Sequence, residues 1–243
     1  VLNMQSHKGA HARMGATDVC PLVPISGVTM EECVALSVQL AERIGNELKI
    51  PVYLYENSAS NSERVNLANV RSGEYEGMAD KLKIKKWKPD FGPTALHLTA
   101  GVTAIGAREF LIAYNINLNS HEKKIASDIA LDVREAGRAK RNSKGKFIRE
   151  ADGTIIKVPG SLKSTKAVGW YMDQYKQAQV SMNLTNFNIT SPHQAFDEVC
   201  IQAQNRGLRV TGSELVGLIP LSALINAGLH YLEKQGQSQG IPE

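Results

Sequence analysis

Residues 109–118 read EFLIAYNINL, and this stretch decides the fold of the second half of the chain. From Asn115 onward it alternates polar with apolar residues, which predicts a strand whose end emerges at an open face of a sheet. Working outward, the pattern predicts helices over 121–138, from Ser191 and over 221–232, and strands over 167–171, 178–184, 187–190 and 209–212. From residue 110 the resulting order is β-α-β-β-α-β, the split βαβ pattern of a ferredoxin-like sandwich.

The first hundred residues predict only part of such a unit. Thr29-Met30-Glu31-Glu32 fits a capping box, and apolar residues at helical spacing continue from it to about Leu48. A short strand is predicted over 52–55 and an exposed polar loop over 57–66. We therefore predict an α/β chain, in the form of an α+β sandwich of two ferredoxin-like βαββαβ-type subdomains. The boundaries are 1–107 and 108–243, and the N-terminal subdomain is incomplete in this chain.

Composition narrows the class of protein. The chain has 243 residues, of which 42% are hydrophobic and 21% are charged, and this excludes intrinsic disorder, collagen and coiled coil as its main character. No apolar run approaches the ~20 residues that span a bilayer, and we see no signal peptide. The three cysteines are far apart and form no CxxC, which favours reduced thiols. These features predict a cytoplasmic protein without a membrane partner.

The positive charge is concentrated in one stretch. The formal net charge is +4, but residues 134–166 hold ten Lys or Arg against three acids. A second group of lysines lies between Lys81 and Lys88. Localised positive charge concentrates phosphate, nucleic acid or polycarboxylate ligands, and a solvated lysine-rich face is the alternative.

The densest group of chemically capable residues is Gly9-Ala10-His11-Ala12-Arg13-Met14-Gly15-Ala16-Thr17-Asp18. Its glycines allow a ligand to approach the backbone, and His11 is able to take and return a proton near neutral pH. The alternative is a surface histidine in a glycine loop. His7 and His11 have the i,i+4 spacing of a metal pair, but Gly9 disfavours a helix and no third ligand is evident, so we predict no metal.

Two further glycine-bounded segments are candidates for ligand contact. The first is 90–101, although the chain has neither a GxGxxG nor a GxxxxGK[ST] motif for a nucleotide. The second is 212–220, an apolar turn with Glu214 inside it. That carboxylate is expected either to be paired or to cap the helix that follows Pro220. No GxSxG occurs, and no cysteine has a catalytic signature, so no covalent nucleophile is predicted.

Residues 7–21, which read HKGAHARMGATDVCP, closely resemble the signature of the glutamate formimidoyltransferases, the formiminotransferase domain of the formiminotransferase-cyclodeaminase family. The similarity continues through VYLY at 52–55, RSGEYE at 71–76, DFGP at 90–93, AYNINL at 113–118, REAGR at 134–138 and SELVG at 213–217. It spans essentially the whole chain. Nothing like the cyclodeaminase domain follows, so the chain resembles the monofunctional bacterial type.

The resemblance implies two α/β subdomains with a folate-binding crevice between them, and it implies that the N-terminal subdomain, 1–107, lacks its first segment here. It also implies transfer of the formimino group from N-formimino-L-glutamate to N5 of tetrahydrofolate, a step of histidine degradation. The family's catalytic histidine matches His11, and Glu214 stands where mammalian members have Gln. The substrate- or folate-binding residues implied are Arg13, Met14, Gly15, Asp18, Gly92, Pro93, Thr94, Ala95, Leu96, His97, Leu98, Thr99, Ala100, Gly101, Gly160, Ser161, Leu162 and Glu214.

Tetrahydrofolate, with or without a polyglutamate tail, is thus the expected co-substrate, and the basic residues are expected to bind carboxylates of the two substrates. A homodimer is compatible with this reading. A folate-binding protein without transferase activity is the alternative function. Nucleic-acid binding requires aromatic residues among the Lys and Arg, and residues 134–166 contain Phe147 alone, so no nucleic-acid partner is predicted.

Overall fold

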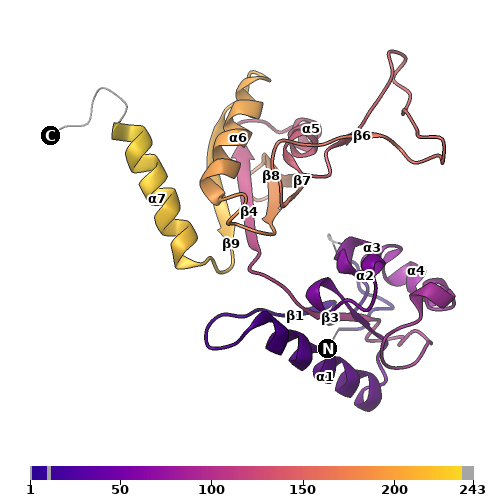
Figure 1. The fold of residues 1–243 in the computed structure, drawn as a ribbon. Helices are drawn as coiled ribbons and strands as arrows, with labels where there is room; N and C mark the ends of the chain where they lie inside the picture. Colours follow the sequence, from indigo (N-terminus) through magenta and orange to yellow (C-terminus); the bar gives the residue numbers. More distant parts are fainter. Residues whose placement is uncertain (1, 10–11, 237–243) are drawn as a thin grey trace. The chain divides into compact units, whose positions relative to one another are not determined.

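A computed structural model describes residues 2–9 and 12–236 of the chain. Contacts divide the chain into two compact units, Val1–Glu109 and Phe110–Glu243, each with its own sheet and its own core (Figure 1). The predicted mixed α/β architecture is confirmed. Within the described residues, no helix combines the length and apolarity needed to cross a membrane.

The N-terminal unit is a small parallel sheet covered by helices. Its strands run in the order β1-β3-β2, and both pairings are parallel. Its elements are β1 (Val19–Leu22), α1 (Met30–Glu47), β2 (Val52–Leu54), η1 (Glu56–Ser58), α2 (Ser62–Val65), α3 (Leu67–Arg71), α4 (Glu74–Lys81), η2 (Lys85–Trp87) and β3 (Thr103–Ala107).

Helix α1 forms where the sequence predicts it. The Oγ1 of Thr29 accepts the Glu32 N–H at 3.2 Å, and the Thr29 N–H donates to the Glu32 carboxylate at 2.8 Å, which completes the capping box. The predicted loop at 57–66 instead contains the short helices η1 and α2. All three strands are parallel, unlike the antiparallel strands of a ferredoxin-like sheet, because helix-containing crossovers connect them.

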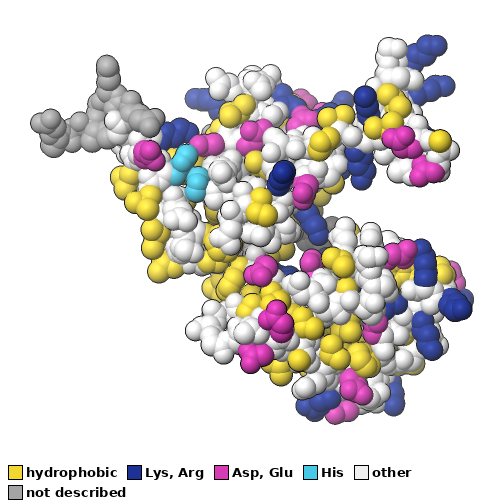
Figure 2. All heavy atoms as spheres, viewed as in Figure 1, with side chains coloured by type: hydrophobic (Ala, Val, Ile, Leu, Met, Phe, Trp, Pro, Cys, Tyr) yellow, Lys and Arg dark blue, Asp and Glu magenta, His cyan; other side chains and the backbone are white. Residues whose placement is uncertain are grey.

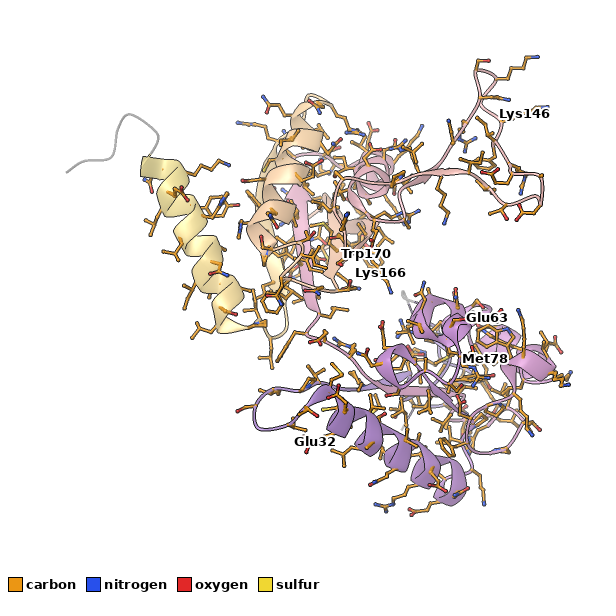
Figure 3. The ribbon with its side chains drawn as sticks, in the orientation of Figure 1. Glu32, Glu63, Met78, Lys146, Lys166 and Trp170 are labelled. Atoms are coloured by element: carbon orange, nitrogen blue, oxygen red, sulfur yellow. The ribbon has the colours of Figure 1, made fainter. Side chains whose placement is uncertain are left out.

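The two faces of this sheet have separate cores. Ala41 of α1 packs with Val52, Leu54 and Ile105 on one face. On the other face, alternate residues of the same strands pack with Met14 and with Met78 of α4; Figure 3 labels Met78. The segment that follows His11 in the sequence is therefore anchored to the face that α1 does not cover.

The C-terminal unit confirms the predicted split pattern. Its four strands are antiparallel throughout and lie in the order β7-β8-β4-β9, so the first and third strands of the motif occupy the centre. Buried side chains of β4, such as Ile116, pack with Ile129 of α5 and Val199 of α6. The elements are β4 (Ile112–Leu118), α5 (Lys123–Val133), β5 (Arg138–Ala139), β6 (Lys157–Val158), β7 (Thr165–Met172), β8 (Gln177–Leu184), α6 (Pro192–Gln204), β9 (Val210–Val216) and α7 (Leu221–Gly236).

Three predicted elements of this unit differ in the structure. The helix predicted to 138 ends at Val133, because Arg134 is extended (ψ 143°) and Gly137 has φ 59°. The strand predicted over 187–190 is wrong: these residues form turns that lead into α6. The last strand continues past 212 to Val216, since it pairs along β4.

A basic ribbon connects α5 to β7. It comprises β5, β6 and the residues between them, and it extends away from the sheet of its own unit (Figure 1). Lys and Arg side chains line it in Figure 2, and Figure 3 labels Lys146 on it. Its one aromatic ring, Phe147, lies under the Arg141 guanidinium at 4.1 Å, so one face of this exposed ring makes an intramolecular cation–π contact.

Candidate functional site

Residues 7–18 are here called the motif segment, and residues 97–102 the facing loop. Residues 14–16 of the motif segment lie against the facing loop. The main-chain N–H of Ala16 donates to the Ala100 carbonyl at 2.9 Å, and the Val102 N–H donates to the Met14 carbonyl at 3.0 Å. Residues 10 and 11 are outside the described part of the chain, so His11 is known here only by its place in the sequence. The structure thus brings together two of the segments that the sequence analysis selected.

Glycines permit this close approach. Gly15 and Gly101 form an antiparallel bridge. A Cβ on Gly15 would lie 2.1 Å from the Val102 carbonyl oxygen, and a Cβ on Gly101 would lie 2.3 Å from the Met14 carbonyl oxygen. Gly101 also has φ 74°, in the left-handed region. The two backbones are therefore too close to each other for side chains at these positions.

Arg13 closes the motif segment on itself. Its Nη2 donates to the His7 carbonyl at 2.8 Å and to Glu76 at 2.7 Å, and its Nη1 donates to Glu76 at 3.0 Å and to Glu74 at 3.3 Å. Its side chain is only 13% exposed. Hydrogen bonds from Arg13 lower the pKa of Glu76 to about 2, and the acids raise the pKa of Arg13. Arg13 therefore ties residue 7 to residue 13, on either side of the position of His11.

Two other predicted binding residues of the motif segment have structural partners. One carboxylate oxygen of Asp18 accepts the Met14 N–H at 2.7 Å, and the other pairs with Arg71. The Met14 side chain is fully buried in the core. These contacts fix the backbone of the turn from residue 14 to residue 18, which directly follows Arg13.

The predicted loop from Gly92 to Gly101 contains no helix or strand, and most of its side chains are exposed or half-buried. The Ala100 N–H donates to His97 Nδ1 at 3.1 Å. Because Nδ1 accepts, a neutral His97 carries its proton on Nε2 and is able to donate from there. Thr94, Ala95, Leu98 and Thr99 are exposed, so these residues are accessible to a ligand.

Residues that the sequence analysis did not select hold these segments together. Arg71, Tyr75 and Glu76 lie at the junction of α3 and α4, and each contacts the motif segment. They belong to RSGEYE at 71–76, a stretch that carried the resemblance but no assigned role. Their contact with residues 13–18 arises from the tertiary fold, and no local sequence pattern predicts it.

In the C-terminal unit, Ser161 and Leu162 follow Gly160 between the basic ribbon and β7. Their N–H groups donate to the carbonyls of Asp132 and Val133, each at 2.9 Å, and the Ser161 hydroxyl donates to Glu198 at 2.8 Å. The two residues line a cavity of about 460 Å³ together with α6 side chains and His230 of α7.

Glu214 lies within β9, where the sequence analysis expected a turn. It is opposite Asn115 of β4, whose Nδ2 donates to the Glu214 carboxylate at 3.3 Å. On the same side of the sheet, the fully buried Gln179 donates from Nε2 to Asn117 at 2.7 Å, while its Oε1 has no hydrogen-bond partner among the described residues. Helices α5 and α6 pack on the other face, and this side of the sheet holds a cluster of polar side chains beside apolar ones such as Val168.

The described residues contain no group of three or more His, Cys, Asp or Glu arranged to hold a metal ion. The acids around the motif segment are paired with arginines, and the face of the C-terminal sheet opposite its core carries Glu214 and several amides beside apolar residues such as Val168. The structure therefore describes an α/β protein of two units, each of which has a group of polar contacts among the residues selected from the sequence.

Comparison with known proteins identifies the family. Residues 1–108 match the family model of the formiminotransferase domain's N-terminal subdomain, and residues 113–243 match that of the formiminotransferase domain. The chain is 46% identical over 235 residues to the formimidoyltransferase-cyclodeaminase of Sus scrofa, covering 97% of this chain and 40% of that protein. It is 44% identical over 232 residues to the glutamate formimidoyltransferase of Streptococcus pyogenes serotype M1, covering 96% of this chain and 70% of that protein.

A third relative, the glutamate formimidoyltransferase of Thermoplasma acidophilum, is 39% identical over 242 residues, which are 99% of this chain and 72% of that protein. The chain spans about two fifths of the length of the bifunctional relatives that it matches. It belongs to the formiminotransferase domain family.

Proposed function

We propose that this chain transfers the formimino group of N-formimino-L-glutamate to N5 of tetrahydrofolate, giving 5-formimidoyltetrahydrofolate and L-glutamate, in cytoplasmic histidine degradation. The names of its relatives support formimidoyl transfer. The structural observation that carries the proposal is the hydrogen-bonded contact of the motif segment with the facing loop. That contact joins residues 14–16, which follow His11 in the sequence, to a loop in which Leu98 and Thr99 are exposed.

The proposed role of His11 follows from proton balance. The attacking amine must lose a proton when it bonds to the amidine carbon, and the departing glutamate amine must gain one. A histidine is able to do both near neutral pH, and such general acid–base catalysis contributes about 10²–10⁴-fold. Holding two large substrates together in the reactive geometry accounts for much of the remaining acceleration. Basic side chains, including those of the ribbon, are proposed to bind substrate carboxylates.

The polar residues present fit tetrahydrofolate as the co-substrate, which supplies the accepting N5 amine. Gln179 Oε1 is a buried acceptor without a described partner, and a buried acceptor of this kind suits an N–H donor of a pteridine ring. We propose that Glu214, the segment Gly160–Leu162 and the loop Gly92–Gly101 contribute further folate contacts. No metal and no nucleic acid are required.

The test is a spectrophotometric transferase assay on His11→Ala, with His121→Ala as the control because His121 is an exposed histidine in the C-terminal unit. We expect His11→Ala to lower turnover at least about tenfold and to leave tetrahydrofolate binding largely intact, since only proton transfer is lost. His121→Ala is expected to match the wild type. Unchanged turnover in His11→Ala removes the proposed role of that residue.

A folate-binding protein without transferase activity is the second candidate, and the same polar surface favours it. Wild-type protein that binds tetrahydrofolate but forms no 5-formimidoyl product in the assay would establish this second candidate. Product formation excludes it.

A further inference from the structure

The junction of α3 and α4, residues 71–76, contacts both segments of the candidate site, and the proposed chemistry gives it no role. Arg71 pairs with Asp18, and Glu76 binds Arg13 through two hydrogen bonds. Tyr75 is different from both, because it contacts the motif segment and the facing loop at once.

Tyr75 makes these contacts with two separate donors. Its main-chain N–H donates to the Arg13 carbonyl at 2.8 Å, and its hydroxyl donates to the Leu98 carbonyl at 2.6 Å. Both acceptors are main-chain oxygens, so the contacts fix the path of the two backbones whatever side chains those positions carry. The phenol ring therefore acts as a spacer of fixed length between the two segments.

The junction is itself firmly supported. The Lys81 ammonium donates to the carbonyls of Asn69, Val70 and Ser72 at 2.6, 2.7 and 3.1 Å, which holds the end of α3. Glu74 has φ 52°, a strained conformation for a residue with a side chain, and such strain persists where the surroundings enforce it. Because these contacts hold the junction in place, the position of the Tyr75 ring sets the position of the facing loop.

We propose that Tyr75 is a positioning residue, which holds the facing loop at a set distance from the motif segment and so determines the affinity for folate. The inference rests on the proposed function, since it assumes that the facing loop contacts tetrahydrofolate. The exposure of Leu98, at 59%, leaves the loop with little packing of its own at this point, and the hydroxyl contact compensates for it.

Tyr75→Phe isolates the effect, because it keeps the ring and the main-chain N–H to Arg13 and removes only the hydroxyl. The control is Tyr175→Phe, which removes an exposed hydroxyl from the turn between β7 and β8. For Tyr75→Phe we expect the Kd for tetrahydrofolate to rise about fivefold, the effect of one neutral hydrogen bond, with kcat at saturating folate within about twofold. Amide hydrogen exchange over residues 97–101 of the free protein should become faster. Tyr175→Phe should change neither quantity.

The outcomes separate this inference from the proposed function. If wild-type protein binds no tetrahydrofolate, the proposed function fails, while hydrogen exchange still reports whether Tyr75 holds the loop. If Tyr75→Phe binds folate like the wild type, or if it loses kcat without any change in Kd, the positioning role is overturned. Unchanged hydrogen exchange over residues 97–101 would overturn it as well.

Discussion

The bridge between Gly15 and Gly101 supports a quantitative prediction for Gly101→Ala. A Cβ at this position would lie 2.3 Å from the Met14 carbonyl oxygen and 2.7 Å from Gly15 Cα, whereas unstrained carbon–oxygen contacts are about 3.3 Å or longer. The two backbones must therefore separate by about 1 Å. Forced overpacking costs about 1–3 kcal/mol. The left-handed backbone, φ 74°, adds about 1–2 kcal/mol for a residue with a Cβ.

The matched control is Gly27→Ala, in the same unit. Gly27 has φ 66°, and no heavy atom lies within 4 Å of the position that its Cβ would occupy. This variant therefore carries the cost of the left-handed backbone without the steric clash. The difference between the two variants isolates the clash, about 1–3 kcal/mol in the free energy of unfolding.

Two assays read the result. Urea denaturation followed by circular dichroism measures the free energy of unfolding. The transferase assay measures turnover, which depends on the geometry of the site. Since a displacement of about 1 Å is able to cost about 10²-fold in rate, we expect Gly101→Ala to lose activity on that scale while Gly27→Ala keeps it. Equal destabilisation of the two variants, with activity retained in both, would refute the close contact of the motif segment with the facing loop.

Two pH-dependent predictions follow from ionisable groups near the site. Arg13 lowers the pKa of Glu76 to about 2, so the stabilisation from this carboxylate is present above pH 4.5 and is lost as the pH falls toward 2. The difference in free energy of unfolding between wild type and Glu76→Gln should thus shrink between pH 5 and pH 2 in urea titrations, and a constant difference would contradict the ion pair. Burial lowers the pKa of Lys81 to about 8, so between pH 8 and 10.5 the unfolded chain retains a proton that the folded protein has released, and stability from this group rises with pH. Lys81→Met should lack that rise, and identical pH profiles for wild type and variant would show that the lysine is not desolvated.

Local sequence patterns predicted the elements whose stability is local. The predicted capping box at Thr29 begins α1, and the helix predicted from Ser191 also begins with a capping box in the structure, whose hydrogen bonds join residues three apart. The alternation from Asn115 onward predicted a strand whose end emerges at an open face of a sheet, and in β4 the residues Asn115 and Asn117 lie on the face opposite the core. The signals failed where tertiary pairing decides: residues 187–190 have strand-like composition but no partner strand, and Glu214 joins β9 because β4 lies beside it.

The site divides in the same way. The sequence by itself determined the mixed α/β class, the split βαβ order of the C-terminal unit and the segments rich in candidate residues, because periodicity, capping and glycine spacing are short-range properties. Only the tertiary structure decided that Gly15 forms a backbone bridge with Gly101 and that Arg71 forms an ion pair with Asp18. It also decided that Tyr75 donates hydrogen bonds to the main chain of both residue 13 and residue 98. These contacts connect positions far apart in the chain, and they exist because the parallel sheet and its core bring the loops at the ends of its strands together.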